Sequence, residues 1–281
     1  MVSLASLFQA KERSRYKPVI RWAGSKRQSL AYLRPYWSSR FTRYVEPFAG
    51  SACLFFDLNP PEAILADINA ELITTYSALK RNVFRVIDAI RRLKKGKRAH
   101  YQIRRINPRT LGDFDLAARF LYLNARCFNG LYRTNQKGEF NVPYRPPGYD
   151  AVDENRLIAA AEALTKVSLY QSDFEETIGL VQNTDFVYLD PPYALDSRRV
   201  FSQYGPSSFS TMDLRRLGKC LELISERGAR FVITYGDSSE ARRLLHPWKP
   251  RRIWTRRHIA GFACHRRGIY ELLASNIELE R

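Results

Sequence analysis

Short apolar runs alternate with amphipathic stretches in the first and last thirds of the chain. This β-α-β alternation is typical of a mostly parallel sheet with helices packed against it. A helical pattern begins after Gly50 and continues through Leu54, Phe55 and Leu58. The runs that predict strands are bounded by polar or turn-forming residues, and they lie at 43–47, 63–66, 167–171, 185–189, 230–235 and 268–275.

The middle third has a different pattern, in which helices dominate. The stretch 75–95, TYSALKRNVFRVIDAIRRLKK, repeats apolar residues close to the 3.6-residue period of a helix. The stretch 113–128, DFDLAARFLYLNARCF, continues in the same manner. The polar segment 129–150 has Gly138 between two short extended runs, which predicts a β-hairpin followed by a proline-rich loop.

These two patterns together predict a two-domain organisation. Residues 1–74 and 166–281 are expected to form an α/β domain, and residues 75–165 a helical and hairpin domain inserted into it. An inserted domain leaves a cleft beside the domain that it interrupts, and such clefts often bind ligands.

The composition indicates the class of partner. The chain has 46 Lys and Arg against 28 Asp and Glu, a net charge of +18. A solvated basic surface is one explanation, but an excess of this size more often marks nucleic acid or an anionic membrane as partner. No apolar run approaches the roughly 18 residues of a spanning helix. At the N-terminus, apolar residues precede charged ones, the reverse of a signal peptide. The cysteines and histidines show no metal-ligand spacing, so we expect reduced thiols, no metal and a cytoplasmic protein.

Acidic residues stand where the predicted strands end. Glu46 ends the first strand, Asp67 follows the second, and Asp173 and Asp190 follow two later strands. The carboxyl ends of parallel strands meet at one edge of a sheet, where open α/β folds bind ligands, and an acid about 20 residues after the first turn commonly binds ribose. No P-loop motif for phosphates occurs. These acids therefore suit an adenosine compound without phosphates, such as AdoMet, whose positive sulfonium tolerates nearby carboxylates.

The strand 185–189 runs into Asp190, Pro191, Pro192 and Tyr193. A proline after the acid keeps Asp190 extended, so its carboxylate is expected at the rim of the sheet. The prolines lack N–H groups but keep their carbonyl oxygens, and Tyr193 adds a flat ring. Two acceptors and a stacking surface suit an exocyclic amino group on an aromatic base. Hydrogen bonds from that amine strengthen as it gains positive charge, which favours its attack on an electrophile.

The motifs RWAGSK, EPFAGSA and DPPY, with the segment FLYLNARCFNGLYRTNQKGEFNVPY, resemble the Dam-type (D12 class, alpha group) DNA adenine-N6 methyltransferases. The motifs stand in the family's order, from about Lys17 to Asn276. The resemblance implies a Rossmann-like AdoMet-dependent methyltransferase sheet with an inserted helical and β-hairpin target-recognition domain. It also implies methyl transfer from AdoMet to a flipped-out adenine in duplex DNA, with GATC as the target. The residues that would carry catalysis are Asp190, Pro191, Pro192 and Tyr193.

The resemblance also implies a cofactor site. In it, Lys26 suits the methionine carboxylate, Asp67 matches the acid that binds ribose, and Asp173 with Phe174 matches the pair that holds adenine. The chain departs from the family pattern in having Ser25 and Ala52 where glycine is usual. The residues assigned to AdoMet are Trp22, Ala23, Gly24, Lys26, Glu46, Phe48, Gly50, Asp67, Asp173, Phe174 and Asp190.

A DNA-reading set is implied in the same way. Arg133 would read a guanine through its O6 and N7 atoms, and Leu131 and Pro143 suit the methyl group of thymine. Residues 144–147 depart from the aromatic-Gly-x-Tyr sequence that usually follows in the family. The residues assigned to DNA are Arg21, Asn129, Leu131, Arg133, Asn135 and Pro143.

Two later segments complete the resemblance. Residues 201–214 resemble the loop that closes over the flipped base, and the basic run 251–267 suits DNA phosphates, with a solvated face as the alternative. Two other functions stay open: a cytosine-N4 or RNA methyltransferase, and a non-catalytic DNA-binding protein that keeps the fold. We expect a monomer that acts on double-stranded DNA in a bacterial or phage-infected cell, without membrane or metal.

Overall fold

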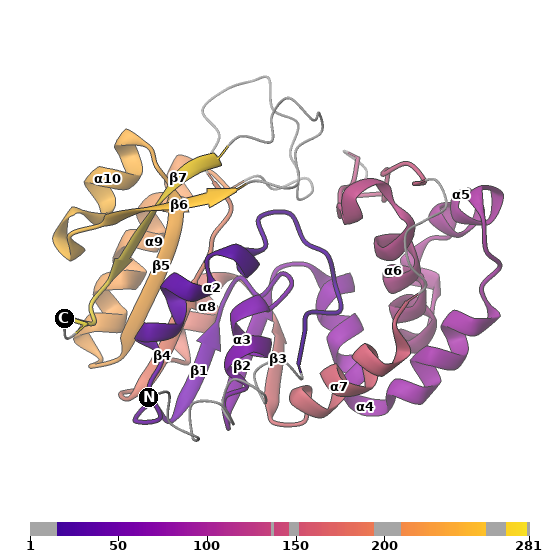
Figure 1. Cartoon of the computed structure of the whole chain (residues 1–281), viewed down its shortest axis with the longest axis horizontal. Helices are drawn as coiled ribbons and strands as arrows, with labels where there is room; N and C mark the ends of the chain where they lie inside the picture. Colours follow the sequence, from indigo (N-terminus) through magenta and orange to yellow (C-terminus); the bar gives the residue numbers. More distant parts are fainter. Residues whose placement is uncertain (1–15, 136–137, 146–151, 194–208, 257–267, 280–281) are drawn as a thin grey trace, which may run out of the picture.

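The computed structural model describes residues 16–135, 138–145, 152–193, 209–256 and 268–279 (Figure 1). Its centre is a seven-stranded sheet with the order β3-β2-β1-β4-β5-β7-β6. Neighbouring strands from β3 to β5 pair in parallel, whereas β7 is antiparallel to both β5 and β6. The strands are β1 (Arg43–Glu46), β2 (Ala63–Asp67), β3 (Val167–Gln171), β4 (Asp185–Leu189), β5 (Arg230–Gly236), β6 (Arg251–Arg256) and β7 (Gly268–Ser275).

The expectation of a mixed α/β fold is confirmed, and each of the six predicted strands is present within a residue or two of its expected bounds. The sequence did not predict β6. Its first residues, Arg251 and Arg252, are exposed, and the segment reads as a basic run because β6 is the edge strand of the sheet. Pairing with β7 makes this segment a strand, although the apolar pattern of the segment itself does not predict one.

The described residues contain nine α-helices, and four of them lie together beyond β3 (Figure 1). The longest, α4, has non-helical dihedrals at Asn82, whose side chain caps the turn that follows by accepting from the Arg85 amide. The helices are α2 (Leu30–Leu33), α3 (Cys53–Leu58), α4 (Ala70–Arg92), α5 (Lys97–Arg105), α6 (Asp113–Arg126), α7 (Glu154–Leu164), α8 (Phe174–Gly179), α9 (Thr211–Glu226) and α10 (Ser239–Leu245).

Two hydrophobic clusters cover the two faces of the sheet. Alternate residues of β4 enter different clusters: Phe186 and Tyr188 belong to one, Val187 and Leu189 to the other. This explains why β4 is a continuous apolar run, since a central strand is buried on both sides. The first cluster continues from the sheet into α4 and α6. Helix α4 runs without interruption across residue 75, where the inserted domain was predicted to begin. The helical group therefore shares a hydrophobic core with the sheet.

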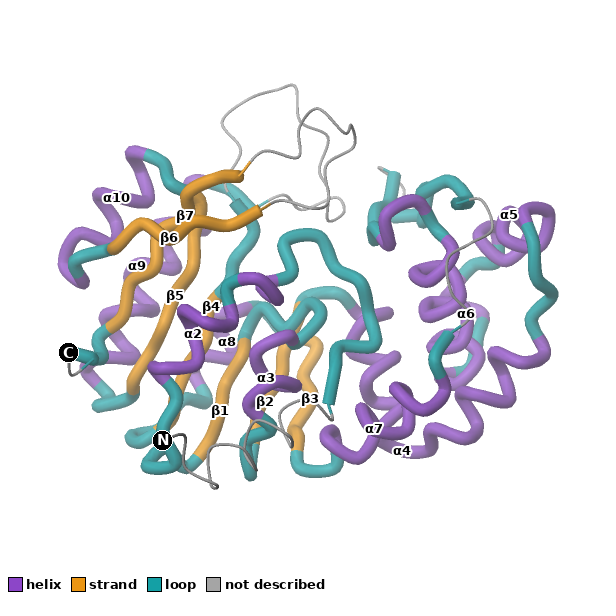
Figure 2. Tube along the Cα trace, viewed as in Figure 1, coloured by secondary structure: helices purple, strands orange, loops and turns teal. Residues whose placement is uncertain are grey.

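The strand order indicates where a ligand would bind. β1 lies between β2 and β4, so the chain leaves β1 toward one side of the sheet first and returns later to the other (Figure 2). In open α/β sheets, ligands bind beyond the carboxyl ends of the strands at such a reversal. Glu46, Asp67 and Asp190 all stand at this edge, at or just after the ends of β1, β2 and β4.

Two further observations concern the described ranges alone. No helix there is long and apolar enough to cross a membrane. No group of three or more His, Cys, Asp or Glu side chains in the same ranges could hold a metal ion.

Candidate active site

An ion pair joins the first motif to the acid that follows β4. Lys26 Nζ lies 2.7 Å from Asp190 Oδ1, and the lysine side chain is only 6% exposed. Thr234, on β5, donates its hydroxyl to the same carboxylate oxygen at 3.1 Å. Among the described residues no hydrogen bond reaches Asp190 Oδ2. The carboxylate is therefore held through one oxygen and keeps the other as an acceptor.

A second carboxylate completes a cluster of polar side chains, the pocket, which consists of Lys26, Asp190, Tyr193, Thr234 and Glu271. Glu271, on β7, is 5% exposed, and its Oε1 lies 3.5 Å from Lys26 Nζ. Tyr193 donates its hydroxyl to that oxygen at 2.6 Å. The Tyr193 ring lies against Gly236, where an added Cβ would come within 3.2 Å of the ring. The sequence prediction included neither Glu271 nor Thr234. The signal for Glu271 was an acid inside the apolar strand GIYELLAS, since core strands seldom carry an unpaired charge.

Burial and neighbouring charges set the protonation of the pocket. Burial raises the pKa of Asp190 to about 6, although the Lys26 ammonium opposes this shift. Burial by itself lowers the pKa of Lys26, but Asp190, Tyr193 and Glu271 outweigh it and hold the Lys26 pKa above its usual value. Near pH 7 the pocket therefore contains a charged lysine and an ionised Asp190. Burial also raises the pKa of Glu46, whose carboxylate accepts the Tyr44 hydroxyl at 2.9 Å.

The turn after β1 brings Trp22, Gly50 and Asp67 together. Gly50 has φ +47°, and its N–H donates to Asp67 Oδ2 at 3.0 Å. A Cβ on Gly50 would lie 2.7 Å from the Trp22 ring, so glycine is required here both by conformation and by space. Ala52 also takes a left-handed conformation, φ 49°. Burial raises the pKa of Asp67 to about 6, while amide donors from Asn69 and Gly50 oppose the shift.

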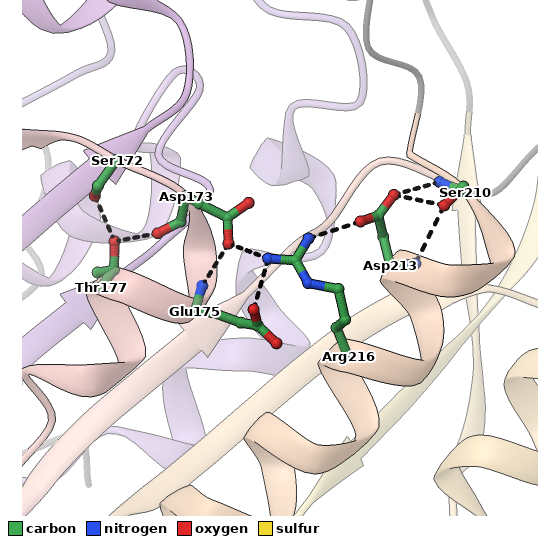
Figure 3. Close-up of polar contacts among 7 residues, drawn as sticks. All are labelled: Ser172, Asp173, Glu175, Thr177, Ser210, Asp213 and Arg216. Atoms are coloured by element: carbon green, nitrogen blue, oxygen red, sulfur yellow. Dashed lines mark hydrogen bonds and ion pairs between the residues drawn. The ribbon is translucent and has the colours of Figure 1, made fainter.

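The acid after β3 belongs to a network that the sequence did not predict (Figure 3). Arg216 Nη2, from α9, lies 2.6 Å from Asp173 Oδ1 and 2.7 Å from Glu175 Oε2. Arg216 Nη1 lies 2.7 Å from Asp213, which forms a capping box with Ser210. Asp173 Oδ1 also caps α8 through the Glu175 amide. One guanidinium thus fixes the acid at the end of β3.

Aromatic rings line the space next to Asp173. Phe174 opens α8 and is 5% exposed, and it stacks on Phe48 with ring centroids 5.3 Å apart. The Arg216 guanidinium lies 4.7 Å from the Phe174 ring centroid. Phe209 contacts both phenylalanines from the segment before α9. An acid and a stacked aromatic pair are thus placed side by side, and the assignment of Asp173 and Phe174 to adenine stays a prediction.

The predicted hairpin has antiparallel pairing, formed as isolated bridges rather than as strands. The Asn141 amide donates to the Arg133 carbonyl at 3.1 Å, and the Asn135 amide to the Glu139 carbonyl at 2.9 Å. The Arg133 side chain donates through Nε to Asn141 Oδ1 at 2.8 Å. Pro143 accepts from the Phe128 amide with its carbonyl at 2.9 Å, which holds the base of the hairpin.

Asn124, on α6, connects the hairpin base to the N-terminal motif. Its side chain accepts from the Arg21 amide at 2.9 Å and donates to the Arg21 carbonyl at 2.8 Å. It also donates to the Gly130 carbonyl at 3.1 Å. Gly130 has φ +63°, and a Cβ there would lie 2.5 Å from the Arg21 side chain. We did not predict Asn124 from the sequence, because one polar residue in a buried helix forms no motif.

The remaining predicted residues stand as follows. Leu131, Ala23 and Pro192 are half-buried, Pro191 is buried and Gly24 is exposed. The side chain of Asn129, residues 201–208 of the predicted closing loop and residues 257–267 of the basic run lie outside what the structure describes.

The sequence of this chain is similar to those of known proteins. The family model of the D12 class N6 adenine-specific DNA methyltransferases matches residues 22–259. The Type II methyltransferase M1.LlaDCHI of Lactococcus lactis subsp. cremoris is 30% identical over 95% of this chain and 97% of its own length. M.MjaIII of Methanocaldococcus jannaschii, also a Type II methyltransferase, is 33% identical over 92% of this chain and 99% of its own. The DNA adenine methylase of Escherichia coli (strain K12) is 30% identical over 91% of this chain and 93% of its own.

Proposed function

Because the chain belongs to the D12 class N6 adenine-specific DNA methyltransferase family, we propose that it transfers the methyl group of AdoMet to N6 of a flipped-out adenine in duplex DNA, with GATC as the target. The observation that carries this proposal is the anchoring of Asp190, whose Oδ1 is held by Lys26 and Thr234 while Oδ2 remains an acceptor. Family membership argues against the cytosine-N4 and RNA alternatives, and the complete pocket argues against a non-catalytic binder.

The residues at the strand ends suit AdoMet. The Asp67 carboxylate, at the end of β2, would accept the ribose hydroxyls. Asp173, held by Arg216, and the Phe174–Phe48 stack would receive the adenine ring. Carboxylates throughout this edge favour a positively charged sulfur over a phosphate. AdoMet, when bound, supplies a methyl group on that positively charged sulfur.

The pocket residues would activate the target amine. Asp190 Oδ2 and the Pro191 carbonyl accept the two N6–H groups, which turns the nitrogen lone pair out of the ring plane. Tyr193 stacks on the base and holds its angle, because its hydroxyl is fixed to Glu271. A bond forms from N6 to the methyl carbon as the carbon–sulfur bond breaks, and the extra N6 proton leaves to Asp190 or solvent. These hydrogen bonds strengthen as N6 gains positive charge.

The helical group and hairpin at 75–165 would form the DNA target-recognition domain, and the rest the catalytic domain. The net charge of +18 supports binding through phosphates, with a log–log salt slope of about 0.9 per contact. Flipping the adenine costs a few kcal/mol, which backbone and groove contacts offset. Arg133 would read a guanine, and its bond to Asn141 presets the guanidinium.

The test of the function is labelled-methyl transfer from AdoMet to a duplex panel that contains GATC and each single-base change of it. Label in GATC alone would support both the chemistry and the target. Label spread over other adenines would keep the chemistry and reject GATC. No label in any duplex would reject the function itself.

The same panel tests Arg133. Arg133→Ala should cost about 1–3 kcal/mol of discrimination at one base pair, because a bidentate guanine contact is lost. We expect GATC and one single-base variant to become similar substrates, while the other variants stay poor. The control is Arg156→Ala, an exposed arginine of α7 that pairs with Asp153. A uniform loss over the whole panel in Arg133→Ala would reassign this residue to phosphate binding.

A separate prediction concerns Arg216. Arg216→Ala should raise the dissociation constant for AdoMet about tenfold with little change in DNA affinity, because Asp173 loses the cation that orients it. Calorimetry with each ligand would measure both. Arg242→Ala serves as the control, because Arg242, on α10, also forms an ion pair with an acid, Asp237. An unchanged AdoMet affinity in Arg216→Ala would exclude the network from the cofactor site.

A further inference from the structure

Glu271 is a buried acid that holds the Tyr193 hydroxyl but makes no contact with the target base in the proposed transfer. It stands on β7 with β5 on one side and β6 on the other, paired with Gly236 and Ile253. Its side chain is almost fully buried, and Oε2 has no hydrogen-bond partner within the described residues. A buried carboxylate oxygen left unpaired opposes folding. Selection for stability alone does not explain an acid at this place.

Within the described residues, the other oxygen of Glu271 makes two contacts, both to groups of the pocket. Oε1 accepts the Tyr193 hydroxyl at 2.6 Å and lies 3.5 Å from the Lys26 ammonium. Lys26 therefore stands between two carboxylates, closer to Asp190 at 2.7 Å than to Glu271. One positive charge is shared by two negative ones, so Asp190 is not fully neutralised by its partner.

We propose that Glu271 is a positioning residue of the methyl transfer: it fixes Lys26 and the Tyr193 ring in place and keeps Asp190 a strong hydrogen-bond acceptor. The inference rests on the proposed function. Without Glu271, Lys26 would lose one of its two carboxylate neighbours among the described residues, and the Tyr193 hydroxyl would lose the bond that Glu271 accepts. Both losses would act on the target amine through other residues, since the proposal places no contact between Glu271 and the base.

The charge of Glu271 also predicts a pH effect. The negative charge of Glu271 raises the pKa of Asp190, which burial holds near 6. Asp190 must be ionised to accept from the amine, so the rate should fall as the pH drops through about 6. Removing the charge should lower the pKa of Asp190 and move this acid limb to lower pH. The titratable groups that face Asp190 are Lys26, Glu46, Tyr188, Tyr193 and Glu271.

The experiment compares Glu271→Gln with the wild-type chain in labelled-methyl transfer to a GATC duplex over a range of pH. Glutamine keeps the shape and removes the charge. We expect kcat to fall by about 10²-fold, the acid limb of kcat to move to lower pH, and the KM values for AdoMet and DNA to change little. Asp57→Asn is the control, because Asp57, on α3, is also buried and is ion-paired with Arg34.

A second variant distinguishes the loss of this contact from misfolding of Glu271→Gln. Tyr193→Phe removes the hydroxyl that Glu271 accepts and keeps the ring. Its effect and that of Glu271→Gln should be less than additive in the double variant, because glutamine weakens the charge-assisted bond that phenylalanine cannot form at all. A Glu271→Gln enzyme with wild-type kcat and an unmoved acid limb would overturn the inference, and so would strict additivity. If the wild-type chain transfers no label, the proposed function fails and this inference fails with it.

Discussion

Asp190→Ala should lower kcat for methyl transfer by at least about 10²–10³-fold, the usual loss when a group that stabilises developing charge is removed. The variant removes the acceptor that the target amine needs in the transition state. DNA affinity should change little, because the proposed DNA contacts lie in the hairpin and on basic surfaces. The measurement is single-turnover transfer of labelled methyl to a GATC duplex, with binding followed separately.

The structure offers a matched control on the same strand. Asp185 begins β4, whereas Asp190 follows its end, and Asp185 is ion-paired with Arg43 at 2.7 Å. Asp185→Asn should reduce the free energy of unfolding and leave kcat per folded molecule near the wild-type value. If Asp190→Ala kept near-normal turnover, the assignment of the pocket would be wrong, whatever its effect on stability.

Lys26→Met should have the largest effect on stability, because it leaves the buried Asp190 without its cation. Breaking a buried ion pair in this way costs about 3–5 kcal/mol. The remaining negative charges should also raise the pKa of Asp190 further, since Lys26 is the main group that lowers it. A group whose folded pKa lies above its unfolded value opposes folding at neutral pH, and this cost disappears as the pH falls through the folded pKa. The variant should therefore recover part of its lost stability as the pH falls from above 6 toward about 4, the usual pKa of an unfolded aspartate.

Chemical unfolding at pH 7 and pH 5 would measure this difference. The acid limb of kcat should move to higher pH in Lys26→Met, the opposite of the shift expected for Glu271→Gln. Lys80→Met is the control, since the Lys80 ammonium donates to the Val167 carbonyl and has no carboxylate partner in the described contacts. A Lys26→Met protein as stable as the Lys80→Met protein at pH 7 would contradict the electrostatic account of the pocket.

The sequence predicted the elements whose apolar pattern is local. β4 and the helices of the middle third are examples, because burial on both faces or on one stripe leaves a periodic signal. Strand β6 was missed, since an edge strand with exposed arginines needs β7 to define it. The motif residues Asp190 and Tyr193 were located because prolines and an apolar strand mark them.

The residues that position the site left almost no local signal. Thr234, Glu271 and Arg216 come from three elements that only the folded sheet brings beside the motif residues. Lys26 shows the limit most clearly. Its assignment to the methionine carboxylate stays a prediction, and the contacts of its ammonium with Asp190 and Glu271 were not predicted. A contact between residues so far apart in the sequence depends on topology, which no single motif records.

If the hairpin reads DNA as proposed, the hydrogen bonds of Asn124 would connect that reading to the catalytic pocket. Asn124 holds the Arg21 backbone and Gly130 at once, and Lys26 follows Arg21 within the same short segment. A hairpin displaced by an incorrect base pair would thus pull on the segment that carries the ammonium of the pocket. Incorrect target sequences would then be rejected at the methyl-transfer step rather than at binding. Near-cognate duplexes in the panel would bind almost as well as GATC but would be methylated slowly.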